Sequence, residues 1–357
     1  MRHSIVKLES LLNKHKIDAA TITKKSNIRY FSGFTSEDCT LLIHHGARYL
    51  ITDFRYIEQG EIQSPDFQVI DAAGAKTAPF IKEILSNIGA EKVWFEDNET
   101  SFRTYSTYNE ALMEGIQLIP DQDLLSSLRI IKTPEEVNHI REASALSDKG
   151  FLHILDYIRP GISELDLALE LEFFLRKNGS EGLAFSIIAA SGKNGSLPHA
   201  EPSDKKLEKG EFITFDFGSK IGGYCSDMTR TVSLGEPDDQ LREIYEVTLQ
   251  AQLNALKVMG PGKTGVEVDK QARDYIQSKG YGEFFGHGLG HGVGLDVHEA
   301  PTLSVRGDKI LEPGMVVSCE PGIYLPGKGG VRIEDLVVIK DEGFENLVSS
   351  PKELIIL

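Results

Sequence analysis

The sequence predicts a two-domain protein, with an α/β domain over residues 1–125 and a larger α+β domain over residues 126–357. Three observations support this prediction. The chain has 357 residues, more than one domain of roughly 150 residues uses. Its first third alternates amphipathic helices with short apolar strands, which is typical of an α/β domain. The remainder places a few long helices among strands separated by Gly-rich turns, which indicates an α+β domain.

The first domain begins with the segment IVKLESLLNKH, whose charged residues interrupt the apolar positions as in an amphipathic helix and unlike a signal sequence. Short apolar strands follow, in the segments DAATIT, CTLLIHH, ARYLIT and KVWFED. The boundary is expected at about residues 125–132. Just beyond it, Thr133, Pro134 and Glu136 form an N-cap, a first-turn proline and a capping-box carboxylate, so a new helix begins there.

Helices in the second domain are expected over residues 134–158, 163–178, 237–258 and 265–279. Pro160-Gly161 ends the first of them and Asn178-Gly179 the second, because proline cannot continue a helix and glycine favours its C-terminal turn. The Gly262-Lys263-Thr264 segment lacks the glycine that a phosphate-binding loop needs five residues earlier, so it is interpreted as a turn between two helices.

The composition narrows the class of partner and the compartment. Asp and Glu number 54 and Lys and Arg 38, giving a net charge of −16. Such a chain is poorly suited to nucleic acid or an anionic membrane, so neither is expected as a partner. No segment approaches the roughly 18 apolar residues that cross a bilayer. The three cysteines are far apart and form no CxxC motif, so a soluble cytoplasmic protein in a reducing compartment is expected.

A first pair of acidic residues lies in FITFDFGSKIGGYCSDMTRTVSL, which is expected to form a β-hairpin around a Gly-rich turn. With the turn centred between Ile221 and Gly222, Asp216 faces Asp227 across the two strands. Their Cβ atoms would lie about 4.5 to 5.5 Å apart. Facing carboxylates repel each other unless one is protonated, both are exposed, or cations lie between them. Flanking aromatic residues argue against exposure.

A second acidic hairpin is expected in MVVSCEPGIYLPGKGGVRIEDLVVI. A turn centred near Gly327 sets Glu320 opposite Glu334. The alternative interpretation is that all four acids are solvated turn residues. That interpretation explains poorly why two such hairpins occur in one domain with apolar neighbours on both sides of each acid.

Three histidines, His287, His291 and His298, lie between the hairpins in the Gly-rich segment FFGHGLGHGVGLDVHEAP. A single histidine in an apolar strand is usually a core residue, but three in this frame indicate a site. Carboxylates with an imidazole form a hard, oxygen-rich ligand set that suits manganese, cobalt, iron or zinc. Four carboxylates exceed the need of one tetrahedral zinc and suit two ions roughly 3.5 to 4 Å apart.

These segments resemble a known family. The runs PHAEPSDKKLEKGEFITFDFGSKIGGYCSDMTRT, GHGLGHGVGLDVHEAP and EPGMVVSCEPGIYLPGKGGVRIEDLVVI resemble the pita-bread metallopeptidases, specifically the branch of Xaa-Pro dipeptidase (prolidase) and aminopeptidase P. The likeness covers roughly residues 125 to 357, and the preceding domain resembles the creatinase-type N-terminal domain. The resemblance implies a creatinase-like α/β N-terminal domain followed by an α+β pita-bread catalytic domain.

The resemblance also implies a dinuclear metal centre, with Mn2+ favoured and Co2+, Fe2+ or Zn2+ as alternatives. Its implied ligands are Asp216, Asp227, His291, Glu320 and Glu334, of which Asp227 and Glu334 bridge the two ions. A metal-bridging hydroxide would attack the scissile carbonyl, and Glu320 would move the proton. This agrees with the chemistry expected of the residues alone, because two cations lower the pKa of a bound water and a nearby carboxylate handles the proton.

Four further side chains receive implied or predicted roles. By resemblance, His298 stabilises the tetrahedral oxyanion, His199 in LPHAEP contacts the substrate, and His287 lines the same pocket. Arg332 lies two residues before Glu334 and therefore on the same strand face, so it is predicted to contact a ligand carboxylate. The alternative for Arg332 is a surface cation at a strand end.

The expected function is hydrolysis of the peptide bond between an N-terminal residue and proline, as an Xaa-Pro dipeptidase. One alternative is an aminopeptidase P that acts on longer Xaa-Pro-Yaa peptides. Others are a methionine aminopeptidase, which normally lacks the long N-terminal domain, and a metal-free binding module of the same fold. The expected partner is a small peptide with proline at its second position. In related enzymes the N-terminal domain of one chain borders the active site of another, so the resemblance implies a homodimer.

Overall fold

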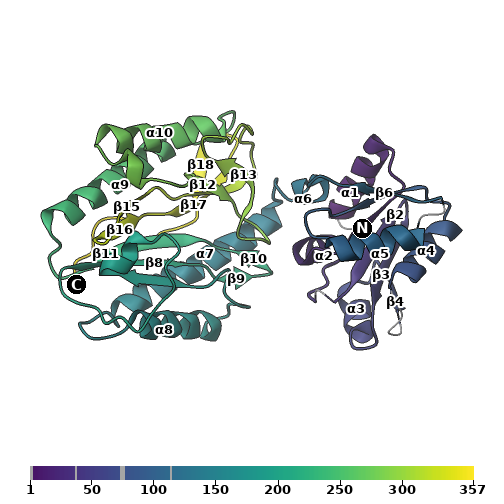
Figure 1. Ribbon diagram of the computed structural model, residues 1–357, viewed down its shortest axis with the longest axis horizontal. Coiled ribbons are helices and arrows are strands. Elements are labelled where there is room, and N and C mark those ends of the chain that lie inside the picture. The colour runs from purple at the N-terminus through teal and green to yellow at the C-terminus, as the bar shows by residue number, and fades with distance from the viewer. Residues whose placement is uncertain (1–2, 37, 73–76, 113–114) are drawn as a thin grey trace. The chain divides into compact units, whose positions relative to one another are not determined.

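The computed structural model describes residues 3–36, 38–72, 77–112 and 115–357 (Figure 1). The chain divides into two compact units, Met1–Arg129 and Ile130–Leu357. Each unit has its own sheets and its own core of buried side chains. Among the described helices, none combines the length and the apolar character that crossing a bilayer requires.

The first unit is built on one mixed six-stranded sheet with the strand order β4-β3-β2-β1-β5-β6. Strand β2 is antiparallel to both β1 and β3, and the remaining neighbours run parallel. Helices alternate with the strands, which confirms the predicted α/β class. The elements are α1 (His3–His15), β1 (Ala19–Ile22), α2 (Lys25–Ser32), β2 (Thr40–His44), β3 (Ala47–Thr52), α3 (Ile57–Gln63), β4 (Gln68–Asp71), α4 (Thr77–Asn87), β5 (Lys92–Phe95), α5 (Phe102–Leu112), β6 (Gln117–Pro120) and α6 (Leu124–Ser127).

The second unit contains four long helices where the sequence predicts them: α7 (Pro134–Leu155), α8 (Glu164–Lys177), α9 (Asp239–Val258) and α10 (Gly265–Ser278). Capping explains their starts. Thr133, Ser163 and Thr264 each form a capping box, in which the side chain accepts from the third helical N–H. Helix α7 packs along α8 and α9 along α10, and these two pairs flank the strands of the unit (Figure 1).

The strands of the second unit form a three-stranded sheet, a five-stranded sheet and two short ribbons. Their orders are β11-β8-β7, β13-β12-β14-β17-β18, β10-β9 and β15-β16. The elements are β7 (Ile188–Ser191), η1 (Gly192–Ser196), β8 (Glu211–Phe217), β9 (Lys220–Ile221), β10 (Tyr224–Cys225), β11 (Met228–Leu234), η2 (Gly282–Phe284), β12 (Gly290–Gly292), β13 (Glu299–Leu303), β14 (Val316–Cys319), β15 (Gly322–Leu325), β16 (Gly329–Arg332), β17 (Asp335–Ile339) and β18 (Phe344–Asn346).

The core of the second unit orients the acidic positions. Cys319 and Ile333 are fully buried in the cluster that also contains Ile244 and Ala251 of α9. Successive side chains of a strand point to opposite faces, so burying these two residues in the core turns the following Glu320 and Glu334 away from it. The packing of these neighbours therefore sets the direction of the two carboxylates. Burying a large apolar side chain such as that of Ile333 stabilises the fold by roughly 1.5 to 3 kcal/mol.

The first acidic hairpin has a different register from the predicted one. Thr229, and not Asp227, lies opposite Asp216. The turn is centred on Gly222 and Gly223, whose φ angles are 59° and 83°. A two-residue hairpin turn with positive φ at both central positions favours a Gly-Gly pair. Its centre lies one residue beyond the predicted one, which moves the partner of Asp216 by two residues. The prediction that the two aspartates face each other directly is therefore wrong.

The second acidic hairpin has the predicted register. Strand β15 sets Gly322 opposite Arg332, and β14 and β17 continue the same register beyond the ribbon. Gly327 in the turn has a φ of 74°, a conformation that glycine adopts without strain. Glu320 and Glu334 occupy equivalent positions between the two strand pairs, as predicted.

Candidate metal centre and active site

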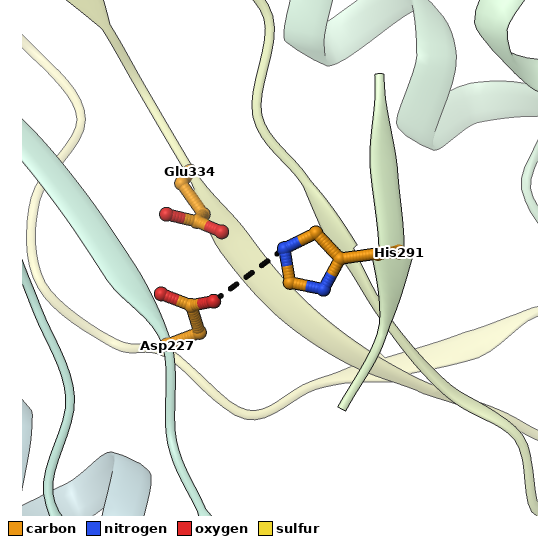
Figure 2. Close-up of side chains that lie close together, drawn as sticks. All are labelled: Asp227, His291 and Glu334. Atoms are coloured by element: carbon orange, nitrogen blue, oxygen red, sulfur yellow. Dashed lines mark ion pairs between the residues drawn. The ribbon is translucent and has the colours of Figure 1, made fainter. Parts of the chain in front are cut away.

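Three of the predicted ligands converge on one point. Asp227, His291 and Glu334 each offer a ligand atom, and these atoms all lie within 4.8 Å of one another. Figure 2 shows the three side chains pointing toward a common space, with His291 Nε2 3.7 Å from an oxygen of Asp227. They come from the loop before β11, from β12, and from the link between β16 and β17. Segments far apart in the sequence thus meet at a single group of potential ligands.

The other two predicted ligands border the same cavity. His291 Nε2 lies 3.2 Å from Glu320 Oε1, and that oxygen also accepts a hydrogen bond from Ser318 Oγ at 3.2 Å. Asp216 accepts a hydrogen bond from Arg332 at 2.6 Å. All five predicted ligands line one cavity of about 600 Å3. This volume is in the range of small-molecule sites.

The pKa shifts indicate that the carboxylates of the cluster lack enough nearby positive charge. Burial, followed by repulsion from Glu334 and Asp216, raises the pKa of Asp227 well above its usual range. Burial, followed by repulsion from Glu320 and Asp216, does the same for Glu334. Burial opposes a charge on His291, but the hydrogen bond with Glu320 raises its pKa above the ordinary value. Positive charge placed among these groups would stabilise them.

Unpartnered oxygens identify where that charge belongs. Glu334 Oε1 and Asp216 Oδ1 are buried and make no hydrogen bond among the described residues. A buried carboxylate oxygen without a donor costs free energy unless a cation supplies the missing interaction. Hard oxygen donors with one imidazole, gathered around such orphaned atoms, fit divalent cations of the manganese, cobalt, iron and zinc group.

Arg332 makes the predicted contact with a carboxylate of this set. Only 4% of the residue is exposed, so the alternative of a surface cation is wrong. Besides its ion pair with Asp216, it donates to Thr229 Oγ1 at 3.1 Å, to the Tyr324 hydroxyl at 2.8 Å and to the Pro198 carbonyl at 3.2 Å. The guanidinium therefore fixes one acid of the cluster and leaves the other oxygen of that acid unpartnered.

Tyr324 is a cavity residue that the sequence analysis missed. Its hydroxyl lies 2.9 Å from His287 Nε2, so it connects that imidazole to Arg332. A signal was present, because Tyr324 is two residues along β15 from Gly322, the residue paired with Arg332. Side chains two residues apart share a strand face, so the tyrosine and the arginine belong to the same face of the ribbon.

The three remaining predicted histidines also line the cavity. His287 Nδ1–H donates a hydrogen bond to the Gly288 carbonyl oxygen at 2.8 Å. The ring of His298 lies 4.3 Å from that of His291, in a T-shaped arrangement. Burial lowers the pKa of both His287 and His298, so each is neutral near pH 7 and keeps one N–H to donate. His199 reaches the cavity from the loop after η1.

One wall of the cavity is apolar, formed by Phe185, Ile187, Ile188, Pro198 and Val297. Of the described residues that line the cavity, Arg332 is the one Lys or Arg, and four of its five N–H groups already donate hydrogen bonds. The cavity thus combines an acidic cluster, neutral imidazoles and an apolar surface. Such an arrangement can activate water beside a hydrophobic group of a ligand.

Comparisons with known proteins agree with this geometry. The model of metallopeptidase family M24 matches residues 138–341, and that of the Creatinase/Prolidase N-terminal domain matches residues 5–131. The Xaa-Pro dipeptidase of Pyrococcus furiosus is 36% identical over 366 residues, which cover 99% of this chain and 100% of that protein.

Solved structures are similar over nearly the whole chain. The Xaa-Pro dipeptidase from Bacillus anthracis superposes with a TM-score of 0.95 at 44% identity and covers 99% of both chains. The X-Pro aminopeptidase from Thermotoga maritima MSB8 gives a TM-score of 0.89 at 39% identity, covering 96% of this chain and 98% of that one. These likenesses confirm the predicted fold class, a creatinase-like N-terminal domain followed by a pita-bread catalytic domain. The chain belongs to metallopeptidase family M24 and is a hydrolase.

Proposed function

We propose that this chain hydrolyses the peptide bond between an N-terminal residue and proline, as an Xaa-Pro dipeptidase that uses two divalent ions. The observation that carries the proposal is the convergence of four carboxylates and one imidazole on one cavity, where buried oxygens of Asp216 and Glu334 have no donor within the described part of the chain. Divalent ions bound there would lower the pKa of a water molecule and polarise the scissile carbonyl.

The proposed ligands are Asp216, Asp227, His291, Glu320 and Glu334, with Asp227 and Glu334 shared between the ions. For two of these ligands, a neighbouring donor occupies one carboxylate oxygen and leaves the other free to bind a cation, which supports the assignment. Thr229 Oγ1 donates to Glu334 Oε2 at 2.7 Å, and Arg332 donates to Asp216 Oδ2 at 2.6 Å. Such outer contacts orient a ligand carboxylate before the cation binds.

Glu320 is the proposed proton carrier. Cleavage adds the hydroxyl of water to the carbonyl carbon and leaves a proton for the prolyl nitrogen, which carries no hydrogen in the intact bond. A carboxylate beside the reacting atoms can take that proton from water and deliver it to the nitrogen. The Ser318 hydroxyl and His291 hold one oxygen of Glu320, at 3.2 Å each, which supports this assignment.

Three histidines are proposed to act on the substrate. His298 would donate an N–H to the oxygen that gains negative charge, because its ring lies beside His291. His199 would contact the substrate from the loop after η1, and His287 would line the pocket with its position set by Tyr324. The apolar wall suits a pyrrolidine ring, since an imide nitrogen brings no N–H that needs a partner.

The ion, the assembly and the compartment are further parts of the proposal. Mn2+ is the favoured ion because oxygen donors dominate the set, while Co2+, Fe2+ or Zn2+ satisfy the same donors. A homodimer follows from the family resemblance and is checked by light scattering. Cytoplasmic location is supported by the free thiols of Cys39, Cys225 and Cys319.

One observation favours a second candidate, an aminopeptidase that removes the first residue from longer Xaa-Pro-Yaa peptides. A dipeptide ends in a carboxylate just beyond its proline, and a basic residue would be its natural partner. Among the described residues that line the cavity, no lysine occurs and the guanidinium of Arg332 is occupied by four acceptors. A peptide with further residues has no charge at that position.

The test compares four substrates with protein loaded with Mn2+, Co2+ or Zn2+. They are an Xaa-Pro dipeptide, its C-terminal amide, an Xaa-Pro-Yaa tripeptide and an Xaa-Ala dipeptide. The proposal expects metal-dependent release of the first residue from the proline substrates and at least about tenfold slower cleavage of Xaa-Ala. Equal cleavage of Xaa-Ala, or no cleavage with any ion, contradicts it. Faster cleavage of the amide and tripeptide than of the dipeptide selects the second candidate.

A further inference from the structure

A buried carboxylate outside the cavity is tied to the loop that carries His199. Glu164 is the first residue of α8 and is completely buried. Its Oε1 accepts from the backbone N–H of Ser191 at 2.6 Å and from the Ser191 hydroxyl at 2.8 Å. Its Oε2 accepts from the backbone N–H and hydroxyl of Ser203 at 3.2 and 2.7 Å. Asn194 Nδ2 lies 3.2 and 3.0 Å from the two oxygens.

The surroundings of Glu164 are rich in hydrogen-bond donors. Five donor groups reach its two oxygens: the backbone N–H and hydroxyl of Ser191, those of Ser203, and the Asn194 side-chain amide. The residue also lies in the first turn of α8, where the helix dipole favours negative charge. Lys205 Nζ donates to Ser191 Oγ at 2.9 Å, which places a cation one hydrogen bond away.

These donors bracket the cavity loop. Ser191 ends β7 and Asn194 lies in η1, before the loop, whereas Ser203 follows it. The intervening segment 198–202 lines the cavity and includes His199. One carboxylate therefore joins both ends of this segment, which leaves few residues free to move between the tied points.

His199 depends on that tie more than His287 depends on its own backbone. Within the described part of the chain, no hydrogen bond is made by its ring, whereas His287 contacts Tyr324. The loop is also held by the hydrogen bond from Arg332 to the Pro198 carbonyl and by that from the Ala200 N–H to the Leu197 carbonyl, both at 3.2 Å. The direction of the His199 imidazole is therefore set by the backbone that carries it.

We propose that Glu164 is a positioning residue for the peptidase reaction, which holds the loop 198–202 so that His199 meets the substrate. This proposal rests on the proposed function, in which His199 contacts the substrate. It differs from a general role in stability because it predicts that the effect of Glu164 on catalysis passes through one imidazole.

The matched control is Asp148 of α7, a second buried acid that ties two segments through serines. It accepts from the backbone N–H and the hydroxyl of both Ser349 and Ser350. Neither serine lines the cavity. Asp148→Asn and Glu164→Gln therefore remove comparable hydrogen-bond acceptors in the same unit, one away from the cavity and one beneath its loop.

The experiment measures kcat and KM of the Mn2+-loaded full chain with an Xaa-Pro dipeptide or Xaa-Pro-Yaa tripeptide, whichever the wild type cleaves. Glu164→Gln presents an amide N–H to groups that donate, so the loop loses its tie. The expected result is a fall in kcat/KM of about tenfold or more, mainly through KM, with unchanged Mn2+ content. Asp148→Asn should keep the wild-type kcat/KM.

A double-mutant cycle with His199→Ala tests the route of the effect. If Glu164 acts through His199, Glu164→Gln causes no further loss in the His199→Ala background. Equal losses in both backgrounds, or wild-type kcat/KM in Glu164→Gln, overturn the positioning role and leave the proposed function standing. Wild-type kcat/KM in His199→Ala removes the substrate role of His199 and the positioning role with it.

A milder variant guards against misfolding of Glu164→Gln. Ser203→Ala removes one hydroxyl donor at the loop end and leaves the other hydrogen bonds to Glu164 in place. It should raise KM by a smaller factor, again only when His199 is present. A Ser203→Ala protein with unaltered KM, or with an equal rise when His199 is absent, contradicts the proposal.

Discussion

Glu96 in the first unit and Glu334 in the second are buried to the same extent, with 2% and 1% of each residue exposed, yet their surroundings are opposite. Glu96 accepts from the backbone N–H groups of Thr23 and Lys24 at 2.6 and 2.7 Å and from Asn27 Nδ2 at 2.5 Å. Glu334 accepts one hydrogen bond, and its Oε1 has no donor among the described residues. A buried acid needs donors or a cation. The protein therefore supplies the donors that the Glu96 carboxylate needs, whereas one oxygen of Glu334 has no donor among the described residues.

The same contrast separates the other buried acids. Asp148 and Glu164 are surrounded by hydrogen-bond donors, as Glu96 is. The pKa of Asp227, by contrast, is raised by burial and by its acidic neighbours, and Asp216 has an unpartnered oxygen. Among the described residues, the unpartnered buried oxygens of Asp216 and Glu334 lie at one cavity beside Asp227, whereas that of Asp121 lies alone in the first unit. It is the grouping of such acids that distinguishes the proposed ligands from structural carboxylates.

The largest expected effect is that of Asp227→Asn. Loss of a carboxylate at the centre of the cluster should reduce turnover at least about a thousandfold in Mn2+-treated protein and weaken metal retention. The fold should persist, because the change removes like-charge repulsion and no hydrogen bond of a structural acid. Turnover, metal content and thermal unfolding are measured on one preparation. A metal-loaded variant with the wild-type rate contradicts the role of Asp227.

Next in size is Arg332→Met, which leaves Asp216 without its 2.6 Å ion pair. Outer contacts of a metal ligand typically contribute 10- to 100-fold to affinity or activity, so a loss of about that size is expected. The measurement is Mn2+ affinity by titration calorimetry. The hydrogen bonds of Arg332 do not involve Glu96, Asp148 or Glu164. An unchanged Mn2+ affinity would therefore show that Asp216 is oriented without Arg332.

The comparison also predicts how the metal-free protein responds to pH. The pKa values of Asp227 and Glu334 are raised above those of an unfolded chain, so the folded state binds more protons as these groups titrate. Stability is then greatest below about pH 4 with respect to these groups and falls as the pH rises, by at most about 1.4 kcal/mol per pH unit for each. Thermal unfolding in chelator from pH 5 to 8 measures the slope. Glu334→Gln should flatten it, and Mn2+ should restore stability at the alkaline end. A slope of the opposite sign is the contrary result.

The smallest expected effect is that of Glu96→Gln on the free energy of unfolding. An amide in place of a carboxylate faces backbone donors with its own N–H, which costs about 1 to 3 kcal/mol. Metal content should not change. Denaturant unfolding of the metal-free variants measures this difference. Glu334→Gln should raise the free energy of unfolding, whereas Glu96→Gln should lower it. If both variants shift stability in the same direction, the two glutamates are not different in kind.

Local signals in the sequence accounted for much of the fold and of the cluster. The capping box at Thr133 and the glycine turn at Gly327 act within a few residues, so helix α7 and the Glu320–Glu334 register could be predicted. The register of the aspartate hairpin could not, because the neighbouring glycines of the GG turn allow more than one centre. The structure selects Gly222-Gly223.

Long-range contacts explain what the sequence did not reveal. The donors of Glu164 are spread over residues 191–203 and meet only after β7 and α8 pack together. Tyr324 shares a strand face with Arg332, but its contact with His287 joins segments far apart in the sequence, and no short motif encodes that contact. Residue types and spacing indicate a ligand set, whereas the groups that orient it depend on tertiary packing.

The most direct test of the central claim is anomalous diffraction from crystals grown with Mn2+, recorded on both sides of the manganese absorption edge. Two peaks per chain are expected, roughly 3.5 to 4 Å apart, among Asp227, His291 and Glu334. Manganese peaks elsewhere in the chain, or none beside these three side chains in protein that cleaves an Xaa-Pro peptide, would contradict it.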